Sequence, residues 1–302
     1  MKTLTALVRR NTLLFFKDKG TFFASLVTPM ILLVLYASFL GNIYRDTFLM
    51  SFESYGFTVS EKIIRGFVSG QLLSSLLAAC CVTVSFCSNM LMVQDKATKT
   101  RRDLTITPVK RSTLALSYYL STVLTTLLVF LVALTVCLIY IATQGWFLSA
   151  AEAALIVLDM VLLILFGTAL SSIVNFFLST QGQISAVGTI VSSVYGFLCG
   201  AYMPISQFGE GLQKVISFLP GTYGTALLRN HCLGGVFREL ERLDYNKAII
   251  QGIADTMDCN PKLLGNTVSI GGMYAILGGT TVLLIGVYVL INCTLGRKRK
   301  EA

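Results

Sequence analysis

The sequence contains little charge for its length. Of its 302 residues, 13% are charged and 54% are hydrophobic, whereas soluble domains carry about 25% charged residues. Long apolar runs that cross a bilayer form helices, because the backbone polar groups must be satisfied within the segment. We therefore expect an all-α polytopic membrane protein in which residues 1–302 form a single transmembrane domain, with no separate soluble domain.

Motifs for catalysis and nucleotide binding are also missing. The sequence has no G-x-x-x-x-G-K-S/T motif, so the chain cannot cradle the phosphates of ATP by itself. It has no H-E-x-x-H motif, and its single histidine, His231, is expected to have a structural role. We therefore expect no enzyme activity, catalytic residue, metal site or cofactor in this chain.

The eight cysteines do not indicate a disulfide framework. Six of them lie in apolar runs, where cysteine usually behaves as a small hydrophobic residue: Cys80, Cys81, Cys87, Cys137, Cys199 and Cys293. Cys232 and Cys259 lie outside those runs. They either pair, closing a loop and stabilising the region by up to about 3 kcal/mol, or remain free thiols.

Six apolar stretches have the length of membrane-spanning helices. They cover residues 21–40, 63–93, 114–142, 150–178, 184–203 and 267–295. Residues 1–19 alternate apolar and basic faces, which predicts an amphipathic helix held in the membrane interface by apolar burial and anionic lipid; a frayed basic tail is the alternative. Residues 41–62 are expected to form a short external loop.

Segment 94–113, between the second and third spans, is the most basic interior part of the chain. Residues 93–114 contain six Lys and Arg residues and two Asp residues, which gives a formal charge of +4. Loops rich in Lys and Arg stay in the cytoplasm, and 15 of the 24 basic residues fall on this side of the predicted topology. The segment and both termini are therefore predicted to be cytoplasmic, in a multi-pass protein of the plasma membrane. The same asymmetry accounts for the net charge of +9 without nucleic-acid binding.

Two features within the spans suggest function or close packing. Gly188, Ser192, Gly196 and Gly200 place a small residue at every fourth position, which allows close approach of another helix at a dimer interface or along a substrate path. Asp159 is the one ionisable residue expected deep in a span, where charge is costly. It either lines a substrate route or pairs with a polar group of a neighbouring helix.

Residues 204–266 form the longest region outside the spans. An amphipathic face over residues 208–219 ends at Pro220 and Gly221, and residues 223–233 are apolar again. Two short apolar segments separated by Pro-Gly fit a pair of external re-entrant half-helices packed against protein. A small external helical cap is the alternative.

Taken in order, these features resemble the membrane-spanning permease subunit of type-2 ATP-binding cassette exporters over nearly the full chain. The N-terminal amphipathic helix is similar to the connecting helix of that family. The segment QDKATKTRRDLTITPVKRSTL is similar to its coupling segment, with the pattern L-x-x-x-P-V-x-R at Leu104, Pro108 and Arg111. The stretch GAYMPISQFGEGLQKVISFLPGTYGTALLR is similar to the segment after the fifth span, with Gly200, Pro204, Pro220, Tyr223 and Arg229 in place. The predicted re-entrant turn comprises Pro204, Pro220, Gly221, Tyr223 and Arg229.

The resemblance implies a permease that dimerises with an identical or related subunit and couples to separate ATPase subunits, which hold ATP and magnesium. A coupling helix over about residues 95–107 would seat in a groove of the ATPase. Its candidate contacts are Asp95, Lys96, Lys99, Arg101, Arg102, Leu104, Pro108 and Arg111. Substrate would move outward. An ion- or proton-coupled secondary transporter is the alternative, although that class uses intramembrane charges and usually has repeated halves.

Overall fold

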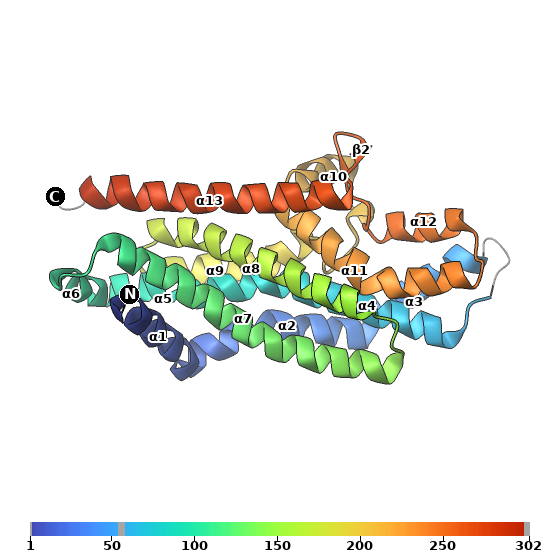
Figure 1. Cartoon of the computed structure of the whole chain (residues 1–302), viewed down its shortest axis with the longest axis horizontal. Helices are drawn as coiled ribbons and strands as arrows, with labels where there is room; N and C mark the ends of the chain where they lie inside the picture. The colour runs from blue at the N-terminus through green and yellow to red at the C-terminus, as the bar shows by residue number, and fades with distance from the viewer. Residues whose placement is uncertain (1, 54–57, 299–302) are drawn as a thin grey trace.

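The computed structural model describes residues 2–53 and 58–298, which form an elongated bundle of helices. In chain order the elements are α1 (Lys2–Lys17), α2 (Lys19–Leu35), the π-helix η1 (Tyr36–Leu40), α3 (Gly41–Glu53), α4 (Glu61–Asn89), α5 (Leu91–Ala97), α6 (Thr100–Ile106), α7 (Arg111–Gln144), α8 (Ala150–Phe177), α9 (Gln181–Leu198), the 3-10 helix η2 (Ile205–Gln207), α10 (Glu210–Ser217), α11 (Pro220–Arg242), α12 (Lys247–Thr256), the two-stranded β1 (Lys262–Leu263) and β2 (Asn266–Thr267), and α13 (Ile270–Lys298). The start of α1 and the end of α13 lie at the same end of the bundle as α5 and α6, and α3 and α12 lie at the other (Figure 1).

Five of the described helical stretches are long and apolar enough to cross a membrane. They are Lys19–Met50, Glu61–Ala97, Arg111–Gln144, Ala150–Phe177 and Ile270–Asn292. They coincide with five of the expected spans, so the protein is an all-α polytopic membrane protein. The remaining expected span, residues 184–203, corresponds to α9, which has 18 residues and carries several Gln, Ser and Thr side chains. The total of six spans therefore stays a prediction.

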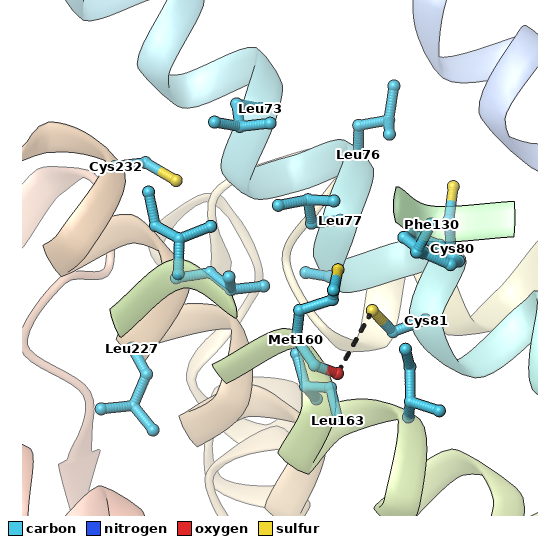
Figure 2. Packing of buried hydrophobic residues seen from close by; sticks show 14 of the residues in the cluster. Leu73, Leu76, Leu77, Cys80, Cys81, Phe130, Met160, Leu163, Leu227 and Cys232 are labelled. Atoms are coloured by element: carbon cyan, nitrogen blue, oxygen red, sulfur yellow. Dashed lines mark hydrogen bonds between the residues drawn. The ribbon is translucent and has the colours of Figure 1, made fainter. Parts of the chain in front are cut away.

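α4 forms the centre of the bundle, with α2, α7, α8 and α11 packed around it. Its most apolar window is 89% buried, against 28% for α7 and 17% for α13. Figure 2 shows Leu77 and Cys81 of α4 beside Met160 of α8, with Leu227 of α11 close to the same core. The Cys81 thiol donates to the Met160 carbonyl at 3.9 Å. Small side chains on α4 allow this close packing on several sides.

The first span is longer than the sequence indicated, because the predicted external loop at residues 41–62 is largely helical. α2 continues through η1 into α3, which ends at Glu53. Tyr44, Phe48 and Phe52 repeat every fourth residue and are buried, so they form one helix face. The Phe48 ring stacks on Phe67 of α4, with centroids 4.2 Å apart. The loop prediction was therefore wrong over 41–53, because this aromatic face extends the helix beyond the most apolar stretch.

Candidate coupling site

The predicted coupling helix is broken into α5 and α6. Lys99 lies between them in the left-handed conformation, with φ at 64°, which is unfavourable for a residue with a Cβ. The expectation of one continuous helix over residues 95–107 was therefore wrong. Thr107, directly before Pro108, is extended and ends α6. This follows from the clash that a proline imposes on the preceding residue in a helix.

Asp95 joins α5 to two other helices. Its carboxylate accepts two hydrogen bonds from the Arg10 guanidinium of α1, at 2.8 and 3.1 Å, and one from the Tyr118 hydroxyl of α7, at 2.6 Å. The Asp95 side chain is 6% exposed and that of Arg10 is 29% exposed. The hydrogen bond to Asp95 raises the pKa of Arg10 above its usual value. This clamp, formed by Arg10, Asp95 and Tyr118, ties the N-terminal helix to the basic segment.

α1 lies along α7 and buries one face. The buried residues of this face are Leu7, Asn11 and Phe15, spaced at four residues as expected for one side of a helix. Asn11, which interrupts the apolar face in the sequence, accepts a hydrogen bond from Arg10 at 2.9 Å. The predicted amphipathic helix is therefore present, and Asn11, the polar residue on its apolar face, is hydrogen-bonded within the chain.

Lys96 caps the C-terminal end of α8. Its ammonium donates to the backbone carbonyls of Asn175, Phe176 and Leu178 at 2.8, 2.7 and 3.0 Å. A cation at a helix C-terminus satisfies carbonyls that have no partner in the helix and interacts favourably with the helix dipole. Asp95 and Lys96, both candidate ATPase contacts, are therefore placed in contacts within this chain.

The other candidate contacts remain at the surface of the basic segment. Lys99, Arg102, Pro108 and Arg111 are exposed. Arg101 and Leu104 are partly buried. The accessible part of the segment is therefore a row of basic side chains held on a short helix and the turn that follows it.

The stripe of small residues on α9 packs largely within the chain. A side chain at Gly188 would collide with Met90, and one at Gly196 would collide with the ring of Tyr202. Gly200 has φ at 74°, a conformation that glycine adopts without strain. Gly188 and Ser192 also border a groove between α2 and α9, with a volume of about 640 Å³.

The region after α9 folds into α10 and α11 around the predicted turn. Pro220 is the first residue of α11, where its missing N–H has no partner to lose. Gly221 lies against the Tyr195 hydroxyl, where a Cβ would collide. The Tyr223 hydroxyl donates to the Ser217 carbonyl at 2.5 Å. The second segment extends to Arg242, well beyond the expected 223–233, and it is largely buried against α4, α8 and α13.

Arg229 of α11 links this region to the segments that follow α9 and α12. Its side chain is 1% exposed; it donates to Asp258 at 3.1 Å and to the Gly200 carbonyl. Asp258 also accepts from the Ile205 amide at 2.7 Å, just after Pro204. Burial of Asp258 raises the pKa of its carboxyl above the usual value. One buried guanidinium thus holds together α11, the end of α9 and the segment after α12.

Asp159 lies at the junction of three helices. One carboxylate oxygen is 2.5 Å from Nδ1 of His231 on α11, and the other accepts from the Tyr274 hydroxyl of α13 at 2.5 Å. Asp159 is fully buried and His231 is 8% exposed. The sequence singled out Asp159 but neither partner, although the one deep acid and the one histidine of the chain were a possible pair.

Cys232 and Cys259 are both free and buried, so the hypothesis that they form a disulfide was wrong. Burial raises the pKa of the Cys259 thiol to about 12, which leaves it protonated and unreactive at neutral pH. Each cysteine fills space in the interior. The alternative prediction, that the two thiols are free, is confirmed.

The fold and this arrangement define a class of membrane protein, in which an amphipathic N-terminal helix is clamped to a basic segment between two spanning helices. A family model described as ABC-2 type transporter matches residues 2–232. The chain belongs to this family, and it is the membrane permease part of such a system. Comparisons with curated proteins and with solved structures gave no significant match.

Proposed function

We propose that this chain is the transmembrane subunit of an ATP-driven exporter, which forms the substrate path with a second permease subunit and couples to a separate ATPase. Membership of the ABC-2 type transporter family supports this proposal. The observation that carries the coupling role is the clamp between Arg10, Asp95 and Tyr118. Because the clamp ties α1, α5 and α7 together, a force on the basic segment is passed to the N-terminal helix and to a spanning helix at once.

The exposed and partly buried side chains from Lys99 to Arg111, on α6 and its flanking turns, are the proposed ATPase contacts. Lys99, Arg101, Arg102 and Arg111 supply the charge, with Leu104 and Pro108 between them. Arginine can bind a carboxylate with two parallel hydrogen bonds, which lysine cannot do. ATP and magnesium are bound by the ATPase in this proposal. Closure of the ATPase dimer then displaces α6 and switches access through the permease, driven by contacts that differ between the two states.

The groove between α2 and α9 is the proposed surface for the second permease subunit or the substrate path. It is lined by apolar side chains of α2, such as Val27 and Ile31, and by hydroxyls of α9, such as Ser185 and Thr189. A mixed lining of this kind suits an amphipathic cargo moving outward through a bilayer.

The orientation proposed for this subunit places α5, α6 and both termini in the cytoplasm. The support is the excess of Lys and Arg at that end. Single cysteines replacing Lys99 and Glu241, in a background without accessible thiols, are expected to react from opposite sides of the membrane. Labelling of both by an impermeant reagent on intact cells would exclude this orientation.

The coupling role is tested by changing Arg101 and Arg102 together to Gln. The local charge falls from +4 to +2, which still retains the segment in the cytoplasm. We expect normal insertion and abundance, weaker association with the ATPase, and loss of transport. Lys110→Gln is the control, because it removes one charge from the same segment and leaves both arginines in place. A double variant that assembles and transports like the parent would leave the segment with a topological role only.

An ion- or proton-coupled secondary transporter is the alternative, and the buried contact between Asp159 and His231 is the observation that favours it. We propose a structural role for Asp159 instead, because both of its oxygens are already bonded within the chain. Transport that continues without an ATPase partner and depends on a proton gradient would favour the alternative.

A further inference from the structure

A basic cavity of about 440 Å³ lies where α5, α6, α7, α8 and α13 meet. Lys99, Arg101, Arg102 and Arg111 line it, together with Phe176 and Asn292. Among the residues that the structure describes around this cavity, none of the lining side chains is acidic. With Lys96, which also borders the cavity, five basic side chains line this one small volume.

The nearest acidic side chains along the chain are used elsewhere. Asp95 of α5 is bonded to Arg10 and Tyr118. Asp103 of α6 is exposed and does not line the cavity. Lys96 contributes a further positive charge at the cavity wall, while its ammonium is bonded to the end of α8. An anion in the cavity would relieve the repulsion among these like charges.

The cavity also lies at the ends of apolar helices. The apolar side chains Leu116 of α7, Phe177 of α8 and Leu290 of α13 are 45%, 58% and 63% exposed, close in sequence to the lining residues of the same helices. Each helix is long and apolar enough to cross a membrane. The cavity is therefore at the boundary between the apolar surface of the bundle and its basic end.

We propose that this cavity binds the phosphate headgroup of an anionic phospholipid, whose acyl chains lie along α7, α8 and α13. Basic pockets between spanning helices suit the headgroups of anionic lipids, and guanidinium groups bind phosphate oxygens through paired hydrogen bonds. An acidic side chain of the ATPase is the less suitable occupant, because the cavity is walled by the ends of spanning helices as well as by the protruding α6.

The test measures lipid retained by the purified permease without any ATPase. The protein is exchanged into micelles containing equal amounts of phosphatidylglycerol and phosphatidylcholine, and bound lipid is counted by native mass spectrometry. The variant is Arg102→Gln with Arg111→Gln. Its matched control is Lys110→Gln with Lys247→Gln, which removes the same charge from exposed sites that do not line the cavity.

We expect the wild type and the control to retain phosphatidylglycerol in preference to phosphatidylcholine. The cavity variant should lose affinity by about fivefold for each cation removed, which corresponds to about 1 kcal/mol for a Lys or Arg at a lipid surface. Equal retention by the cavity variant and the control would overturn the proposal. Preferential binding of inorganic phosphate without retained lipid would also overturn it, in favour of a soluble anion.

The cations of this cavity are also proposed ATPase contacts, so the lipid role and the coupling role are separated by the measurement and not by the residues. Lipid retention is measured on the permease alone, so a negative result leaves the proposed ATPase contacts untouched. Conversely, normal lipid retention by a permease that does not bind an ATPase would count against the coupling role only.

Discussion

Two buried aspartates, one at the basic end and one in the core, are held in similar ways by different partners. Asp95 is bonded to a guanidinium and a tyrosine hydroxyl, and Asp159 is bonded to an imidazole and a tyrosine hydroxyl. Asp95 receives three hydrogen bonds and its cation is partly exposed, whereas Asp159 receives one on each oxygen in the fully buried interior. Each carboxylate joins three helices.

The difference lies in what each site loses when a partner is removed. Arg10 carries a permanent charge and reaches water, so solvent can partly replace it. His231 and Asp159 are enclosed by the apolar core, where an unpaired polar group keeps its full desolvation penalty. The core site is therefore expected to hold the bundle together more strongly, and the basic-end site to set the position of α1.

The largest expected effect comes from His231→Leu. This change leaves the Asp159 carboxylate buried with the Tyr274 hydroxyl as its remaining partner, and we expect it to lower the free energy of unfolding by about 3 kcal/mol. The measurement is thermal or denaturant unfolding in detergent. The double variant Asp159→Leu with His231→Leu should recover at least half of the loss, because no carboxylate then remains. A double variant less stable than the single one would show that the contact itself, and not the orphaned charge, dominates.

Arg10→Gln should have a smaller effect on global stability, about 1 to 2 kcal/mol, because the Arg10 side chain is partly exposed. Its main consequence should be local, since α1 loses its bonds to Asp95. Hydrogen exchange of the α1 amides is expected to rise while that of α8 stays unchanged. Arg9→Gln is the matched control, because Arg9 is exposed on the same helix. Equal protection of α1 in the two variants would show that the bonds of Arg10 to Asp95 do not hold α1 in place.

The Asp95 and Asp159 sites can be compared directly by removing the tyrosine hydroxyl from each. Tyr274→Phe should destabilise by about 2 kcal/mol and Tyr118→Phe by about 1 kcal/mol, because Asp95 keeps two bonds from Arg10 and Asp159 keeps only its contact with His231. Unfolding of both variants in the same detergent provides the comparison. The reverse order would mean that the basic-end site is the more tightly held of the two.

The smallest effect concerns Cys232, the residue after His231, as a reporter of the core site. Cys232 is buried and free, so a maleimide should react with it only after unfolding. In Tyr274→Phe, we expect slow labelling of Cys232 in the folded protein, detected by site-resolved mass spectrometry. Cys259, which is buried outside the Asp159 site, is the internal control and should stay unlabelled. Equal labelling of both thiols would indicate general loosening of the fold.

The sequence predicted the class of fold and most of the spans, because long apolar runs have few alternatives in a membrane. It also identified Asp159 as a residue in need of a partner. It did not find His231 or Tyr274, which lie 72 and 115 residues away. Periodicity describes one helix at a time and contains no information on how deep α11 lies relative to α8.

The coupling segment shows the same limit at shorter range. Composition and the turn at Pro108 were sufficient to find the segment and its end. The break at Lys99 was not predicted, because no glycine or proline marks it. Asp95 and Lys96 had been grouped with the surface cations and acids, yet both are bonded to other parts of the chain. The charge of a residue in the sequence does not show whether its side chain is available to another protein or is bonded within its own chain.

The central position of α4 has a consequence for how the protein is made. Its buried polar side chains include Gln71, Ser74 and Asn89, and these leave the ribosome before α8 and α11, two of the helices that pack around α4. α11 begins about 130 residues after α4 ends, a delay of roughly 7 to 26 s at the usual rate of chain growth. During that interval α4 must wait beside the insertion machinery or in lipid with hydroxyl and amide groups uncovered. Chains that stop after α7 therefore lack the cover of α8 and α11 and present a partly exposed polar helix, which makes them natural substrates for membrane quality control.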